Sequence, residues 1–138
     1  MAERRHERGL IDTSVVIDFE RIDPASLPGE LAVSAITFAE LAAGPHATAD
    51  RNERAARQDR IQRAEAAFEP LPVDAAVARA YGRIYASVVA RGRKARGRLA
   101  FDLLIAATAL AAGLPLYTAN KDAFGGLGDL IEVVSVES

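Results

Sequence analysis

Short apolar runs and longer amphipathic segments alternate along the whole chain. Short apolar runs bounded by turn-forming residues predict buried strands, whereas longer segments with helical spacing predict helices. The expected strands are 9–12, 31–34, 115–118 and 131–136, with a short extended piece at "FEPLPV" and a turn at "NKDAFGGLGD". The expected helices are 14–21, "AITFAELAA" closed by Gly44, 48–67, 74–92 capped by Asp74, and 99–112. This alternation predicts an α/β fold in which a parallel sheet of four to five strands lies between helices on both faces.

Composition limits the class of protein. The chain has 138 residues, half of them apolar, which fits one domain with one core. It has no cysteine, which excludes disulfides and thiolate metal sites, so we expect a cytoplasmic protein. "MAERRHERG" lacks the apolar stretch of a signal peptide, and we interpret residues 1–8 as a charged extension before a domain at 9–136. Gly113 and Pro115 break the uncharged run 103–119, which argues against a membrane span.

Positive charge is concentrated in two places, although the net charge of −2 alone argues against nucleic acid. "RGRKARGR" (91–98) has five basic residues in eight and no acid, which suggests a polyanion or an acidic partner. Its basic members are Arg91, Arg93, Lys94, Arg96 and Arg98. Arginines also recur at every third position from 51 to 63, with acids interleaved. A solvated helix face is the simpler interpretation of that second region.

Three acids stand in apolar surroundings: Asp12 after the first strand, Glu40 in "SAITFAELAAG", and Asp102 in "GRLAFDLLIAATALAAGLP". Each has a local explanation. Asp12 could cap a helix, Glu40 could pair with a buried arginine, and Asp102 could act as an acid in the first turn of its helix. A single explanation covers all three: they converge and share hard divalent cations, Mg²⁺ or Mn²⁺, which prefer oxygen ligands. Such a site suits phosphodiester hydrolysis.

Other catalytic schemes find little support. His6 lies in the charged extension and His46 in a polar loop, so a serine–histidine–acid triad would lack its base. The chain contains neither a GxxxxGK[ST] nor a GxGxxG motif for nucleotide binding.

The motifs around these acids resemble those of a known family. "LIDTSVVID", "VSAITFAELAAG" and "AFDLLIAATALAAGLPLYTANKDAF" are similar, in order and spacing, to the three motifs of PIN-domain ribonucleases, especially the VapC-type toxins of bacterial toxin–antitoxin pairs. The resemblance covers residues 9–136. It implies a three-layer α/β/α fold, Mg²⁺- or Mn²⁺-dependent cleavage of RNA, inhibition by a small cognate antitoxin, and a homodimer or a hetero-oligomer with that antitoxin.

The resemblance also implies roles for individual residues. Asp12, Glu40 and Asp102 would be the catalytic, metal-binding acids. Asp122 is the candidate for a fourth family acid, displaced by one residue because the position before the phenylalanine is Ala123. The supporting polar residues would be Thr13, Ser14, Thr118 and Asn120, and the basic residues of 91–98 would contact RNA or antitoxin. We also expect an antitoxin segment to block the acids, with an arginine competing with the metal.

Two alternatives stay open at this point. A phosphoacceptor signalling domain shares the alternating order, an acid after the first strand, and a late threonine and lysine, Thr118 and Lys121. It would normally need a pair of acids at the first site, and Asp12 follows an isoleucine. A non-catalytic module that keeps the PIN-like fold without the chemistry is the other alternative, and the altered fourth acid is its support.

Overall fold

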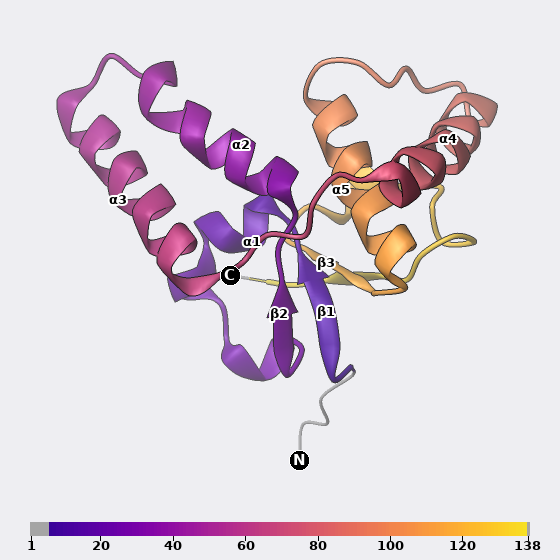
Figure 1. Cartoon of the computed structure of the whole chain (residues 1–138), viewed down its shortest axis with the longest axis horizontal. Coiled ribbons are helices and arrows are strands. Elements are labelled where there is room, and N and C mark those ends of the chain that lie inside the picture. Colours follow the sequence, from indigo (N-terminus) through magenta and orange to yellow (C-terminus); the bar gives the residue numbers. More distant parts are fainter. Residues whose placement is uncertain (1–5, 138) are drawn as a thin grey trace.

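A four-stranded parallel sheet lies at the centre of the computed structural model, which describes residues 6–137 (Figure 1). The strand order is β2-β1-β3-β4. The strands are β1 (Arg8–Ile11), β2 (Glu30–Ala32), β3 (Leu116–Thr118) and β4 (Val133–Ser135). The expected strands therefore exist, each within two residues of its predicted start. Residues 1–5 of the expected charged extension lie outside the described residues.

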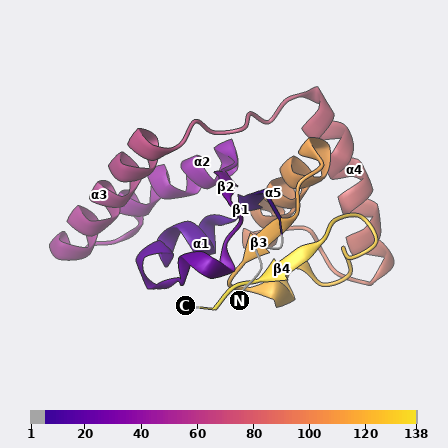
Figure 2. The same cartoon turned by 90° about the horizontal axis from the view of Figure 1, so that it is seen from below.

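Five α-helices and four short 3₁₀ helices connect and cover these strands within residues 6–137. The α-helices are α1 (Thr13–Ile17), α2 (Ala35–Ala43), α3 (Arg51–Ala67), α4 (Ala75–Ala90) and α5 (Arg98–Ala112). The 3₁₀ helices are η1 (Phe19–Arg21), η2 (Pro24–Ser26), η3 (Gly44–Ala47) and η4 (Lys121–Phe124). Figures 1 and 2 show α2 and α3 on one side of the molecule and α4 and α5 on the other.

The two faces of the sheet build two separate hydrophobic clusters. Successive side chains of a strand point to opposite faces, so Leu10 packs with residues of α4 and α5. Ile11 packs with residues of α1, α2 and α3. Leu116 and Tyr117 divide in the same way on β3, and all four side chains are almost fully buried. The predicted arrangement, a parallel sheet between two helical layers, is confirmed.

The first helix is shorter than predicted. α1 ends at Ile17, and the chain continues as the 3₁₀ helix η1 rather than as an α-helix to residue 21. The backbone N–H of Asp18 still bonds the carbonyl of Ser14, but Asp18 itself has left the helical conformation. The run of β-branched side chains from Val15 to Ile17 loses side-chain freedom in a helix, which favours an early end.

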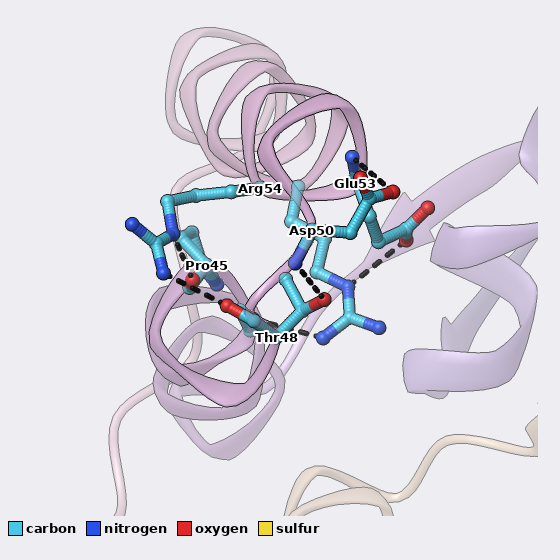
Figure 3. Close-up of polar contacts among 7 residues, drawn as sticks. Pro45, Thr48, Asp50, Glu53 and Arg54 are labelled. Atoms are coloured by element: carbon cyan, nitrogen blue, oxygen red, sulfur yellow. Dashed lines mark hydrogen bonds and ion pairs between the residues drawn. The ribbon is translucent and has the colours of Figure 1, made fainter.

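The long polar helix begins later than predicted, because residues 48–50, which follow η3, are not helical and Asp50 caps the helix instead. α3 starts at Arg51, where Asp50 accepts a hydrogen bond from the backbone of Glu53. Arg54 donates from Nε to the carbonyl of Pro45 (3.1 Å) and from Nη2 to that of Thr48 (2.9 Å), as Figure 3 shows. These bonds fix the start of α3 against the end of α2.

Several arginines of the 51–63 stripe therefore have structural partners. Arg57 donates to the carbonyl of Gly44 (2.9 Å) and to Glu53 (2.9 Å), whereas Arg63 pairs with Glu20 and Asp59. The carbonyls of Gly44 and Pro45 lie just beyond the end of α2, the helix that carries Glu40. The stripe thus fastens α3 to α2 and helps to fix the position of that acid.

α5 is the apolar segment that raised the question of a membrane. It has 15 residues and ends at Gly113, whose left-handed φ of 67° is tolerated by glycine without a side-chain penalty. Within residues 6–137, no helix is long and apolar enough to cross a membrane.

Candidate active site

The register of the sheet brings the polar residues that follow β1 and end β3 side by side. Ile11 of β1 is paired with Tyr117 of β3, so the next residues along the two parallel strands, Asp12 and Thr118, are also neighbours. Both are buried. Thr118 Oγ1 donates to Asp12 Oδ2 at 2.6 Å. The carboxyl ends of parallel strands commonly carry the functional groups of α/β proteins.

Asp12 is held by hydrogen bonds on both carboxylate oxygens. Its Oδ1 accepts from Ser14 Oγ (2.6 Å) and from the backbone N–H of Val15 (3.1 Å), which caps α1. Burial raises the pKa of Asp12, while the hydrogen bonds from Ser14, Thr118 and Val15 act in the opposite direction. The expectation of a helix cap is correct, and the same carboxylate is also the centre of a polar cluster.

The two hydroxyls beside Asp12 are oriented by the backbone. The N–H of Ala119 donates to Ser14 Oγ (3.0 Å), and the N–H of Asn120 donates to Thr118 Oγ1 (2.9 Å). Because each hydroxyl oxygen accepts from the backbone, its own proton is directed to the carboxylate. Asn120 is exposed, and its recorded part in this network comes from its backbone N–H rather than from its side chain.

Glu40 of α2 lies beside Thr13, the first residue of α1. Thr13 Oγ1 donates to Glu40 Oε1 at 2.6 Å and lies 2.9 Å from Thr37 Oγ1. Within residues 6–137 Glu40 forms no ion pair, so the expectation of a buried arginine partner is wrong. Sequence reasoning missed Thr37, a fully buried polar residue. Its spacing of three before Glu40 places both on one helix face and was the available signal.

Asp102 is the fifth residue of α5, so the expectation of an acid in the first helical turn is wrong. Its pKa is raised to about 6, first by burial and then by the negative charges of Glu40 and Asp12. Arg98 and Arg93 act in the opposite direction and lower that pKa. Glu40 and Asp12, the two acids grouped with Asp102 from the sequence, thus both act electrostatically on Asp102.

Asp122 is placed differently from the other three acids. It is exposed on η4, and within residues 6–137 it makes no ion pair or side-chain hydrogen bond. It is also not among the charges that shift the pKa of Asp102. The structure thus does not join Asp122 to the group formed by Asp12, Glu40 and Asp102.

The donor chemistry of this group fits a hard divalent cation. Its three acids are carboxylates, and binding a cation would relieve both their repulsion and their desolvation. In the part of the chain that the structure describes, however, no three acidic, histidine or cysteine side chains are already arranged to hold one ion. The chemical fit therefore rests on the identity of the acids and on the effect of Glu40 and Asp12 on Asp102.

A groove of about 670 Å³ opens beside Glu40, between α1, α2, α3 and α5. Two of its apolar side chains are unusually exposed, Ile17 at 41% and Phe101 at 47%. Arg60 of α3 and Arg98 of α5 also line it. The groove thus combines apolar surface with positive charge next to the acids.

The segment 91–98 crosses from α4 to α5. Arg93 is half-buried and donates from Nη1 to the carbonyl of Ala123 (3.3 Å), whereas Lys94 and Arg96 are exposed. Arg91 is the residue that closes α4, and a side chain at Gly126 would collide with it. The five basic residues predicted as contacts thus occupy different environments.

Comparison with known proteins assigns this architecture. Residues 9–128 match the family model described as PIN domain. The chain is 37% identical over 117 residues to ribonuclease VapC5 of Mycobacterium tuberculosis, covering 83% of this chain and 84% of the relative. It is 38% identical over 133 residues to ribonuclease VapC4 of the same organism, covering 94% and 97%.

Solved structures share the fold. VapBC-5 from Mycobacterium tuberculosis, a member of the VapBC family of toxin–antitoxin systems, superposes with a TM-score of 0.80 and 35% identity. That alignment covers 96% of this chain and 99% of the solved one. VapBC-1 from nontypeable Haemophilus influenzae gives a TM-score of 0.70 at 23% identity over 93% and 97% of the two chains, a likeness of fold.

Proposed function

Because this chain belongs to the PIN domain family, we propose that it is the ribonuclease toxin of a toxin–antitoxin pair. The observation that carries the proposal is the set of three acids in which Asp12 follows β1 at the carboxyl edge of the sheet, and in which both Asp12 and Glu40 act on the charge of Asp102. The two relatives named ribonucleases match most of this chain, which supports nuclease activity. The same match favours this function over a phosphoacceptor domain.

In the proposed mechanism, Asp12, Glu40 and Asp102 would hold Mg²⁺ or Mn²⁺. When bound, such a cation supplies a nucleophilic hydroxide near neutral pH and charge to stabilise the leaving oxygen of the phosphodiester. Ser14 and Thr118 keep the Asp12 carboxylate in place through hydrogen bonds, and Thr13 does the same for Glu40. The positive charge of the segment 91–98 would attract the RNA towards the acids.

The partner is proposed to be a small antitoxin that reaches the acids through the groove beside Glu40. The solved structure of VapBC-5 is described as a member of the VapBC family of toxin–antitoxin systems, which supports an antitoxin partner for this chain. The exposed Ile17 and Phe101 suit an apolar segment of that partner. An arginine at its tip would compete with the metal for the carboxylates. A complex in which Asp12 and Asp102 stay open to solvent would contradict this mode of inhibition.

A homodimer is proposed as well. Tyr85 and Val89 are exposed on α4, at 46% and 48%, and lie four residues apart on one helix face. Light scattering of the purified chain measures its mass in solution, and a strictly monomeric mass would refute the dimer.

The test is RNA cleavage by the purified chain with Mg²⁺, Mn²⁺ or EDTA. Asp12→Asn and Asp102→Asn remove ligand charge with little change in shape, so each should abolish cleavage. Asp129→Asn is the matched control, because Asp129 is exposed on a turn. Cleavage by Asp102→Asn at the wild-type rate in Mg²⁺ would refute the mechanism.

One observation favours a second candidate, a PIN-like module without catalysis: no preformed cluster of metal ligands exists among residues 6–137. Calorimetric titration with Mn²⁺ separates the two functions. Absence of binding in the millimolar range would favour the non-catalytic module, whereas binding that Asp102→Asn removes would favour the nuclease.

A further inference from the structure

The basic segment 91–98 contains residues with distinct structural roles. Lys94 and Arg96 are exposed, and within residues 6–137 their side chains make no hydrogen bond or ion pair. Arg91 packs against Gly126, whose φ of +90° and lack of a side chain allow the contact. These three residues show no specific relation to the acids.

Arg93 is tethered on the β3 side of Asp12, because η4 follows β3 and β3 lies next to β1 in the sheet. Its guanidinium donates to the carbonyl of Ala123 in η4, the segment that follows Thr118 and Asn120. This bond uses one of the five N–H donors of an arginine, which leaves the others for a ligand. Because the side chain is half-buried and tethered, ordering it on a bound anion costs less entropy than ordering a free lysine.

Arg98 lines the groove beside α2, the helix that follows β2, and β2 flanks β1 on the side opposite β3. It is the first residue of α5, and it lines the groove together with Thr13 and Glu40. Arg98 is exposed, and within residues 6–137 neither Arg93 nor Arg98 forms an ion pair with an acid. The guanidinium group of Arg98 thus lies in the groove beside Glu40, that of Arg93 lies against η4, and neither is engaged by an acid.

From this placement we propose that Arg93 and Arg98 hold backbone phosphates on opposite sides of the acid group, whereas Lys94 and Arg96 add only long-range attraction. Arg98 would take the phosphate on the groove side and Arg93 the phosphate beside η4. Guanidinium groups suit this role because they bind phosphate oxygens through two parallel hydrogen bonds. The inference rests on the proposed function, since it takes RNA as the substrate.

The test measures binding of a short fluorescent single-stranded RNA by anisotropy, in EDTA and over a series of salt concentrations. The logarithm of the binding constant falls as the logarithm of the salt concentration rises. Each phosphate contact that is lost should make this negative slope shallower by about 0.7. Arg93→Gln and Arg98→Gln should each show this decrease, and the double variant about twice as much. Lys94→Gln and Arg96→Gln are the matched controls from the same segment, and their slopes should stay at the wild-type value.

Two further measurements separate contact from structural damage. Arg93→Lys and Arg98→Lys keep the charge, so they should retain the salt slope while weakening binding. Melting temperatures identify any variant that fails to fold, and a merely structural role would not alter the salt slope of the folded protein.

The result that overturns the inference is an unchanged slope in Arg93→Gln and Arg98→Gln, or an equal decrease in all four glutamine variants. Cleavage assays in Mg²⁺ distinguish its failure from that of the proposed function. If the wild-type chain cleaves RNA but the Arg93 and Arg98 variants have the same salt slopes as the Lys94 and Arg96 variants, only the inference is refuted. A wild-type chain that neither binds nor cleaves RNA refutes both.

Discussion

Replacing Asp102 by asparagine should stabilise the metal-free protein while removing its activity. Burial and the charges of Glu40 and Asp12 raise the pKa of Asp102 from its ordinary value of 3.8 to about 6. The ionised carboxylate is therefore less favourable in the folded chain than in the unfolded one. Asparagine keeps the shape and removes the charge, so the unfavourable interactions disappear.

The magnitude follows from the change in pKa. At about 1.4 kcal/mol for each pKa unit, the rise from 3.8 to about 6 corresponds to at most about 3 kcal/mol. Asp102 is only half-buried, and solvent screens part of this interaction. We therefore expect a gain of about 1–2 kcal/mol at pH 7.5, or roughly 4–8 °C in melting temperature for a chain of this size.

The pH dependence has a definite sign. Between about pH 4 and pH 6, the folded chain holds a proton on Asp102 that the unfolded chain has already released, so the stability of the wild-type protein falls as the pH rises. Below this range the carboxyl is protonated in both states, and the advantage of Asp102→Asn should vanish. Above it, the advantage should reach its full value.

The assay is thermal unfolding in EDTA at pH 4 and pH 7.5 for the wild type, Asp102→Asn and the exposed control Asp129→Asn. The control should match the wild type at both values. An Asp102→Asn variant that is equally stabilised at both pH values, or destabilised at pH 7.5, would refute the electrostatic explanation.

Three other predictions concern neighbouring residues. Mn²⁺ should raise the melting temperature of the wild type at pH 7.5 more than that of Asp102→Asn; equal shifts in a thermal scan would count against a shared metal site. Thr118→Val removes a hydrogen bond to the buried Asp12 carboxylate, so the acid limb of the pH–rate profile should move to higher pH. An unchanged acid limb would mean that the hydrogen bond from Thr118 does not influence the ionisation of Asp12. Gly9→Ala would place a Cβ 2.6 Å from the buried ring of Tyr117 and should cost about 1–3 kcal/mol in urea unfolding; no loss would mean that the ring moves aside.

The fold was largely predictable because its signals are local and repeated. Apolar runs such as that ending at Ile11 mark buried strands, and the alternation with helices specifies a parallel sheet. The residue at which α1 ends and the residue at which α3 begins were less predictable. Asp50 caps α3, whereas Asp18 makes no side-chain capping bond, and where a helix begins or ends also depends on contacts such as those of Arg54 with the η3 turn.

The candidate site was predictable to the extent that its members break the hydrophobic pattern. Asp12, Glu40 and Asp102 stood out because each is a lone acid in an apolar stretch, and in the structure Asp12 and Glu40 both raise the pKa of Asp102. Thr37 was missed because a threonine in a helix does not break the pattern. Asp122 was included on the resemblance alone, and its exposure on η4 is a property of the turn that no spacing reveals.

The local explanations for these acids do not compete with the functional one. Asp12 caps α1 and also lies at the centre of the site, because the cap geometry holds its carboxylate at the end of β1 with one oxygen on Ser14 and the other on Thr118. Asp102 has no such set of bonds, and its pKa of about 6 reflects a charge that the metal-free protein compensates only in part, through Arg93 and Arg98. A group that retains such an uncompensated charge in an apolar helix is more useful for binding a cation than for stabilising the fold. The electrostatic cost of Asp102 and its proposed role are thus two consequences of the same arrangement.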